Sequence, residues 1–345
     1  MWIIRPVTKI MNKFGYFFIL PAALLISCEK DDYLNSYPSE IRFDISYHLL
    51  EGKRISCIDF DKKGNAYIGS GTELYYQYHG EIKSYNTGFP VLDLAVAPDQ
   101  TVWIGTNGGG LCHFEDNKFT WYNMANSGLP RDVVMNVEAG PDGTIWFASC
   151  AHKLGGLGIY DGKRFTFLTP ENSPLNQNII DDIEIGPDGN VYIATSGTVG
   201  RTNIYHISGN SWKCLGKDEG TFYWAKSFTI GPSGSIYIVE DFSLSSTWQT
   251  DKLYKFDNDR WKNIDLGDQP LLSFFTAIKA DKRNYCWLTS SEGNESTLLV
   301  FDGSKWFRSP EGLFPDDLLI TTLETDSENN IWAGTWSDGI FIINQ

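Results

Sequence analysis

One aromatic residue recurs seven times along this chain, each time inside the same short phrase. The seven positions lie between 36 and 50 residues apart: Tyr67, Trp103, Trp146, Tyr192, Tyr237, Trp287 and Trp332. A unit of about forty residues cannot bury an apolar face alone, so the units must stack on one another. That spacing leaves room for four short strands in each unit. The repeat therefore predicts an all-β fold, a seven-bladed β-propeller of four-stranded blades.

Turn residues before each aromatic support this prediction. Pro141-Asp142-Gly143 precedes Trp146, and the other copies carry related turns. Proline pre-sets φ, Asp bonds back to the backbone and Gly accepts positive φ. A small residue two positions after the aromatic, such as Gly105, allows close approach of a neighbouring blade. A second hairpin follows, with Asp161-Gly162 between two apolar segments.

The two ends of the repeat region predict how the ring closes. The seventh unit stops at its third strand, 340–343, and a strand-like segment, 41–45, precedes the first unit. We expect the segment 41–45 to pair with 340–343, completing the last blade and covering its open edge.

The local phrase resembles a known family. Trp103-Ile104-Gly105-Thr106 followed by Gly109-Gly110-Leu111, and Trp332-Ala333-Gly334-Thr335 followed by Asp338-Gly339-Ile340, are similar to the two-component regulator propeller repeat. The resemblance covers most of residues 55–345. It implies a periplasmic sensor of glycan fragments of the kind found in hybrid histidine kinases of Bacteroidetes. Because the sequence holds neither a kinase nor a further transmembrane segment, we expect a stand-alone lipoprotein instead of a complete receptor.

The N-terminal residues 1–27 predict a signal peptide. They contain Arg5, Lys9 and Lys13, no acidic residue, and an apolar run from 14 to 26. Leu25-Ile26-Ser27-Cys28 resembles a bacterial lipobox, which implies cleavage before Cys28 and a lipid anchor on its thiol. Translation from Met1 and from Met11 both fit this pattern. A secreted protein with a chance cysteine is the alternative.

The next segment places the protein at the cell envelope. The acidic stretch Glu29-Lys30-Asp31-Asp32 resembles the export signal of surface lipoproteins of Bacteroidetes, although a solvated tether has the same composition. We expect a flexible tether over 28–40 and a propeller over 41–345. The localisation that follows is an outer-membrane lipoprotein, exposed at the surface or facing the periplasm.

Charge limits the partners. Residues 28–345 hold 25 basic and 43 acidic residues, a net charge of −18. This excludes nucleic acid as a partner and permits neutral glycans, peptides or cations. The cysteines and histidines are scattered, so we expect no metal and no cofactor. We expect a monomer that binds an oligosaccharide, a peptide or an envelope protein.

Candidate ligand-binding residues lie in the loops that a propeller gathers on one face. Aromatic platforms are expected at Tyr223, Trp224, Trp248 and Trp336, and hydrogen-bonding groups at Asn107, His152, Lys153, Arg201 and Asp338. Each residue also has a structural interpretation, as core aromatic or solvated loop tip.

Three functions fit these features. The preferred one is a non-catalytic binding module for glycan fragments or peptides. A lyase or hydrolase acting on a polysaccharide or peptide is the second, with His152, Lys153 and Tyr223 as weak acid–base candidates. A scaffold for protein–protein interaction is the third, because fold alone does not choose between them.

Overall fold

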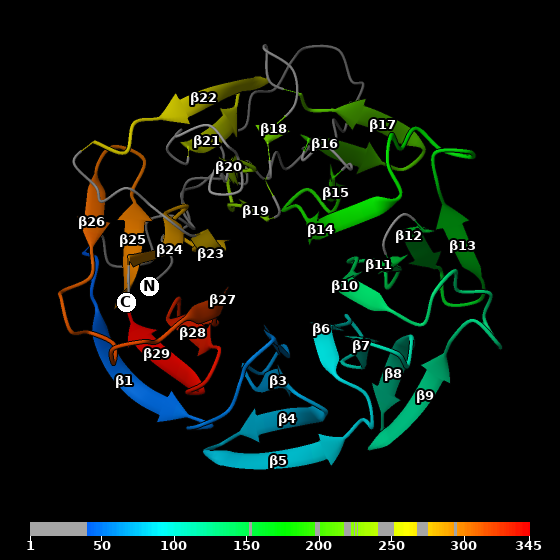
Figure 1. Cartoon of the computed structure of the whole chain (residues 1–345), viewed down its shortest axis with the longest axis horizontal. Helices are drawn as coiled ribbons and strands as arrows, with labels where there is room; N and C mark the ends of the chain where they lie inside the picture. The colour runs from blue at the N-terminus through cyan, green and yellow to red at the C-terminus, as the bar shows by residue number, and fades with distance from the viewer. Residues whose placement is uncertain are drawn as a thin grey trace, which may run out of the picture.

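The computed structural model describes residues 40–151, 154–196, 201–216, 222–223, 225, 227–240, 252–267, 275–292 and 295–345. In this part of the chain, seven antiparallel sheets stand around a central axis (Figure 1). The seven-bladed β-propeller predicted from the repeat is confirmed. The predicted signal peptide, Cys28 and all of the tether except Glu40 lie outside the described residues. No helix in the described part of the chain is long and apolar enough to cross a membrane.

Each blade has four strands that run from the axis to the rim. The innermost strands are β2 (Cys57–Phe60), β6 (Val91–Val96), β10 (Val134–Ala139), β14 (Ile179–Ile185), β19 (Phe228–Ile230), β23 (Phe275–Ala280) and β27 (Ile320–Thr325). The second strands are β3 (Ala66–Ser70), β7 (Val102–Thr106), β11 (Ile145–Ala151), β15 (Val191–Ser196), β20 (Ile236–Glu240), β24 (Cys286–Glu292) and β28 (Ile331–Thr335).

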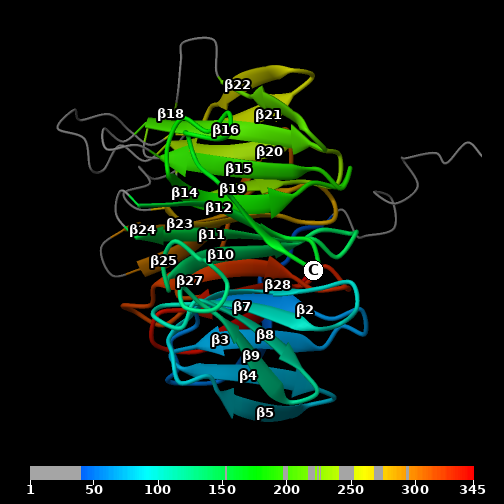
Figure 2. The ribbon, with the colours of Figure 1, turned by 90° about the vertical axis from the view of Figure 1, so that its right-hand side faces the viewer.

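The outer half of each blade follows the same order. The third strands are β4 (Glu73–Tyr78), β8 (Leu111–Glu115), β12 (Leu154–Tyr160), β16 (Arg201–Ser208), β21 (Lys252–Asp257), β25 (Glu295–Phe301) and β29 (Ile340–Asn344). The outermost strands are β5 (Glu81–Asn86), β9 (Lys118–Tyr122), β13 (Phe165–Leu168), β17 (Ser211–Cys214), β22 (Arg260–Ile264), β26 (Trp306–Arg308) and β1 (Asp44–Leu49). A short extra strand, β18 (Phe222–Tyr223), pairs with β16. Seen from the side, the strands run across the thickness of the disc (Figure 2).

The ring closes through the two ends of the described chain, as the sequence predicts. Strand β1 pairs antiparallel with β29, with Leu49 opposite Ile340 and Asp44 opposite Asn344. The paired strand begins at Asp44, three residues later than the segment 41–45 that we expected. Ile41 and Phe43 instead pack against the hydrophobic cluster between the sixth and seventh blades. The last blade therefore joins residues nearly 300 positions apart in sequence.

An aspartate holds the turn before the repeat aromatic in six blades, and Ser233 takes its place in the fifth. In the second blade, Asp99 Oδ1 accepts the amide N–H of Thr101 at 3.0 Å. In the third, Asp142 Oδ1 accepts the amide of Thr144 at 2.9 Å. These carboxylates satisfy turn amides, the role that Asp takes in Asx turns.

At some of the junctions between blades, close packing requires the glycine two positions after the aromatic. A Cβ added to Gly105 would lie 2.7 Å from the carbonyl oxygen of Val134 in the next blade. At Gly334 it would lie 2.8 Å from Ile55 in the first blade. The glycine backbone of one blade thus packs directly against the next blade. The hydrophobic core is divided into clusters that lie between neighbouring blades.

Candidate functional site

The central channel is lined by residues that stand in register with the repeat aromatics. On the innermost strand of every blade, the residue opposite the aromatic stands at one level around the axis, and all of these residues except Ala95 and Thr229 line the described channel. These residues are Asp59, Ala95, Glu138, Glu184, Thr229, Lys279 and Glu324. We call this set the lower ring. It contains four carboxylic acids and one amine.

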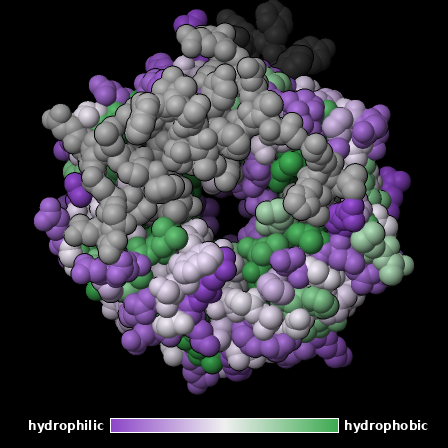
Figure 3. Space-filling model, viewed as in Figure 1, coloured by the Kyte–Doolittle hydropathy of each residue, from purple (hydrophilic) through white to green (hydrophobic). Residues whose placement is uncertain are grey.

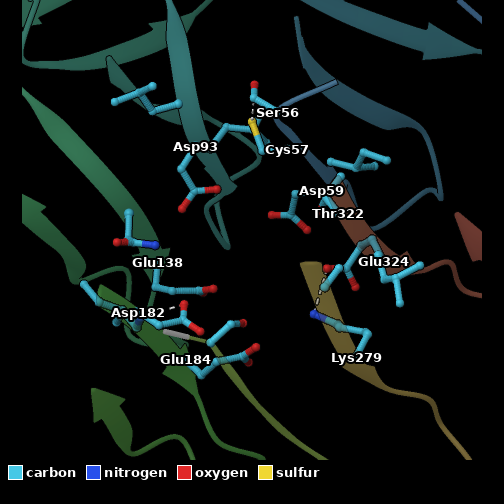
Figure 4. A pocket seen from close by; sticks show the side chains of 18 of the residues that line it. Ser56, Cys57, Asp59, Asp93, Glu138, Asp182, Glu184, Lys279, Thr322 and Glu324 are labelled. Atoms are coloured by element: carbon cyan, nitrogen blue, oxygen red, sulfur yellow. Dashed lines mark hydrogen bonds and ion pairs between the residues drawn. The ribbon is translucent and has the colours of Figure 1, made fainter. Parts of the chain in front are cut away.

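A second level lies two residues earlier on the same strands, because alternate residues of a strand share a face. Its members that line the channel are Cys57, Asp93, Asn136, Asp182, Ser227, Ala277 and Thr322. The cavity enclosed by the two levels has a volume of about 430 Å³. The space-filling view shows the opening at the axis (Figure 3). The carboxylates of both levels point into this space (Figure 4).

Several of these side chains link one blade to the next. Asp59 Oδ2 accepts the amide N–H of Val96 at 2.7 Å, and Asp93 Oδ2 accepts that of Val137 at 2.8 Å. Asp182 Oδ2 accepts the amide of Phe228 at 3.1 Å. The innermost strand is the edge of its sheet, so its outward amides lack a strand partner. The carboxylates supply that partner and hold the ring together.

The channel raises the pKa of its carboxyl groups. Burial raises the pKa of Asp59 and of Asp93 to about 7, against the backbone hydrogen bonds that lower it. Burial also raises the pKa of Glu184 to about 7. The pKa of Glu138 rises well above its ordinary value through burial and through the charge of Glu184. The pKa of Asp182 rises for the same two reasons.

One ammonium group offsets part of this negative charge. Lys279 Nζ lies 2.7 Å from Glu324 Oε2, and the two side chains are 22% and 20% exposed. Burial alone would lower the pKa of Lys279, but the carboxylates of Glu324 and Glu184 outweigh it and the pKa rises. The lysine stays charged, and the lining holds six carboxyl groups to one amine (Figure 4).

This arrangement suits a cationic group or a donor of several hydrogen bonds. Carboxylates that share a low-dielectric space attract cations and repel anions. Across residues 40–345, the gaps aside, no three His, Cys, Asp or Glu side chains converge closely enough to hold a metal ion. The acidic lining makes the channel a candidate binding site for a cationic group.

Three of the predicted site residues have described side chains, and they lie in loops away from the channel lining. Asn107 is exposed between β7 and β8, and its amide donates to the carbonyl of Pro90 at 2.9 Å. Trp336 is 49% exposed, and the guanidinium of Arg54 lies 3.4 Å from its ring centroid. Asp338 Oδ1 accepts the amide of Gly52 at 3.3 Å.

The other predicted residues are placed only in part. Arg201 and Tyr223 stand opposite each other on β16 and β18, and their side chains lie outside the described set. His152, Lys153, Trp224 and Trp248 lie outside the described residues altogether. The platform of loop aromatics thus stays a prediction.

The acidic channel was missed by the sequence prediction, although the sequence contains its signal. Every member of the lower ring lies eight residues before the repeat aromatic, as Glu138 does before Trp146 and Glu184 before Tyr192. Strand register converts this constant spacing into one level of the channel. Aligning the repeats on the aromatic would have shown the acids gathered at that position.

Comparison with known proteins supports the fold. No protein-family model matches the sequence, and no curated protein matches it. Among solved structures, a streptogramin B lyase matches with a TM-score of 0.68 and 15% identity, over 88% of this chain and 98% of the lyase. The protein YCF48, solved with the D1 peptide, matches with a TM-score of 0.65 and 11% identity, over 90% and 97%.

An extracellular domain from B. thetaiotaomicron is also similar. It belongs to BT3049, described as a hybrid two-component system, and matches with a TM-score of 0.64 and 21% identity. The match covers 86% of this chain, which spans only 40% of the length of that chain. At these identities the likeness shows a shared propeller fold, found in sensing, lyase and peptide-bound proteins alike.

Proposed function

We propose that this protein is a non-catalytic binding propeller of the bacterial cell envelope that captures peptides through a cationic group. The observation that carries the proposal is the charge of the channel, whose described lining places six carboxyl groups and one amine around about 430 Å³. A lysine or arginine side chain, or a peptide amine, would enter this space and bond several carboxylates at once. Anionic ligands would be repelled.

Two further points favour a peptide over a glycan in the channel. The described lining side chains are carboxylates, one lysine, small polar groups, aliphatic residues, one cysteine and one methionine, and none of these described side chains is aromatic. Among the described lining residues, a sugar ring would find no stacking platform. YCF48, a neighbour of similar fold, was solved with the D1 peptide bound, which supports a peptide as the class of ligand.

The envelope location in this proposal rests on the sequence. The lipobox ending at Cys28 would anchor the protein to the outer membrane through its lipid. Residues 29–40 would then separate the propeller from the membrane surface. A ligand captured in this way would be sensed or handed to a partner in the envelope.

Peptide binding measured by fluorescence anisotropy tests the proposal. We expect labelled peptides with one Arg or Lys to bind, and matched peptides with Gln or Glu at that position to bind at least ten-fold more weakly. Glu184→Gln in the channel should weaken binding of the basic peptide, whereas Glu328→Gln on an exposed turn should not. Equal binding of basic and acidic peptides would refute the proposal.

A lyase or hydrolase is the second candidate, favoured by one specific observation. Glu138 and Glu184 come from the neighbouring strands β10 and β14, and both have raised pKa values. A protonated carboxyl beside an ionised one is the pair that general acid–base catalysis uses. Product formation from a bound peptide or glycan, lost in Glu184→Gln while binding persists, would establish this function instead.

A further inference from the structure

A second cavity lies between the first and second blades, on the opposite side of the disc from the loops predicted to bind ligand. Its volume is about 380 Å³. Strands β3, β4 and β5 contribute one side, and two turns of the second blade contribute the other. The lining residues are Tyr67, Tyr76, Tyr85, Phe114, Asp99, Gln100, Thr101, Glu115, Asp116 and Asn117. We call this cavity the tyrosine groove, and none of its lining residues lines the channel.

The aromatic side of the groove is a set of stacked rings. Tyr67 stacks on Tyr76 with centroids 4.6 Å apart, and Tyr76 stacks on Tyr78 at 5.2 Å with an angle of 10° between the planes. Tyr85 lies 4.8 Å from Phe114 and donates its hydroxyl to Asn117 Oδ1 at 2.7 Å. The three lining tyrosines are half-buried. The stacking of Tyr67 on Tyr76 and the contact of Tyr85 with Phe114 hold the rings in place before any ligand arrives.

The equivalent place between the second and third blades is filled. Trp103 stands where Tyr67 stands in the first blade, because each is opposite the lower-ring position of its own blade. The indole of Trp103 lies 5.2 Å from Tyr160 of the third blade, and Tyr122 lies 5.0 Å from Phe165. The phenol at position 67 does not by itself open the groove, because Tyr192 and Tyr237 hold the same position in their blades and are buried. The groove is therefore a local departure from a packed repeat.

The polar side of the groove consists of hydrogen-bonding groups. Asp99 accepts the amide and the hydroxyl of Thr101, at 3.0 Å and 2.8 Å. Glu115, Asp116 and Asn117 form the exposed hairpin turn beside it. Carboxylate and amide oxygens accept hydrogen bonds from hydroxyl groups, and the rings offer apolar faces with polar edges. The groove carries no basic side chain among its lining residues.

We propose that the tyrosine groove is a binding site for a neutral oligosaccharide. A sugar ring presents an apolar C–H face to an aromatic platform and hydroxyl donors at its edge. The groove supplies an aromatic platform for the C–H face and oxygen acceptors for the hydroxyl groups, in a volume of the size that small ligands occupy. Three carboxylates at the rim exclude anionic sugars by charge repulsion. The site stands independently of peptide binding in the channel.

Saturation-transfer NMR and calorimetry with maltotetraose, cellotetraose and mannotetraose test this site, with tetragalacturonate as the anionic comparison. We expect at least one neutral probe to bind and the anionic probe not to bind. Tyr67→Trp, which installs the residue found at position 103, should reduce affinity at least ten-fold while the thermal midpoint is kept. Tyr76→Ala should also abolish binding, whereas Tyr47→Ala, on the outer strand β1, should not.

Other outcomes overturn the proposal. Lack of binding by all three neutral probes would refute it, and so would unchanged affinity in Tyr67→Trp. Loss of sugar binding in Glu184→Gln with retention in Tyr67→Trp would move the sugar to the channel. Failure of peptide binding in the channel would leave the sugar result intact, so the two proposals fail separately.

Discussion

The ammonium nitrogen of Lys279 lies 2.7 Å from Oε2 of Glu324, between the innermost strands of the sixth and seventh blades. This is the only amine among the residues that line the described channel, where six carboxyl groups surround it. The pair therefore does more than join two blades. It reduces the repulsion that the other carboxylates would exert on one another.

Replacing Lys279 by Met should destabilise the propeller by about 2 kcal/mol, between the values typical of exposed and of buried ion pairs. The loss arises because the carboxyl group of Glu324 would no longer face an ammonium group. Guanidinium denaturation at pH 7 would measure it. The double variant Lys279→Met with Glu324→Gln should recover most of the loss. A single variant as stable as the parent protein would show that the pair contributes nothing.

Stability should fall as pH rises from about 4 to about 7. The folded-state pKa of Asp59, Asp93 and Glu184 is raised to about 7, so the folded protein binds more protons than the unfolded chain in this window. Unfolding releases those protons, and higher pH then favours the unfolded state. Turn carboxyls with lowered pKa, such as Asp99 and Asp188, act only below about 4.

Denaturation curves at pH 5 and pH 8 would check this dependence. We expect the free energy of unfolding to be higher at pH 5 by at least about 1 kcal/mol. Asp93→Asn keeps an oxygen acceptor for the amide of Val137 and removes one titrating group, so the difference should shrink. A protein equally stable at both values would contradict the raised pKa values.

The sequence was sufficient to predict the ring of seven blades but not the side chains that form its cavities. The repeat aromatics, the turns and the closing strand predict seven blades because each feature is local and recurs. Ile45, which lies in the segment expected to close the ring, pairs with Ile343 in the last blade. Loop residues such as Trp248 are different, because no repeat fixes their conformation.

The two cavities depend on relations that no single repeat carries. Glu138 and Glu184 meet only because β10 and β14 stand side by side around the axis. The tyrosine groove lies beside Tyr67, whereas the equivalent Trp103 of the second blade packs against Tyr160 of the third. Both features become visible when the seven repeat units are superimposed and compared. Residues that recur in every unit form the fold, and residues that differ between units form the two cavities.

Gly105→Ala should destabilise the protein by about 1–3 kcal/mol, the usual cost of overpacking a core. The new methyl carbon would lie 2.7 Å from the carbonyl oxygen of Val134, on backbone that cannot move freely. Thermal denaturation would measure the loss. The third blade carries Ala148 at the corresponding position, so Ala148→Gly is the reverse control and should cost less than about 1 kcal/mol. A harmless Gly105→Ala would mean that the blades can separate slightly.

Arg283→Met should destabilise the closed ring by about 3–5 kcal/mol, the usual cost of breaking a buried ion pair. Its guanidinium bonds Asp281 Oδ2 at 2.6 Å, with exposures of 3% and 0%, and also reaches Gln345 Oε1 at 2.8 Å and the carbonyl of Glu40 at 3.2 Å. Arg283 thus links the sixth blade to Glu40, which precedes β1, and to Gln345, which follows β29, and β1 and β29 are the two strands that close the ring. We expect faster limited proteolysis near β1 as well as a lower thermal midpoint. Lys213→Met, which removes an exposed partner of Asp259, is the matched control and should change neither measurement. If Arg283→Met lowers the midpoint without any change near β1, the arginine stabilises only its own turn and takes no part in ring closure.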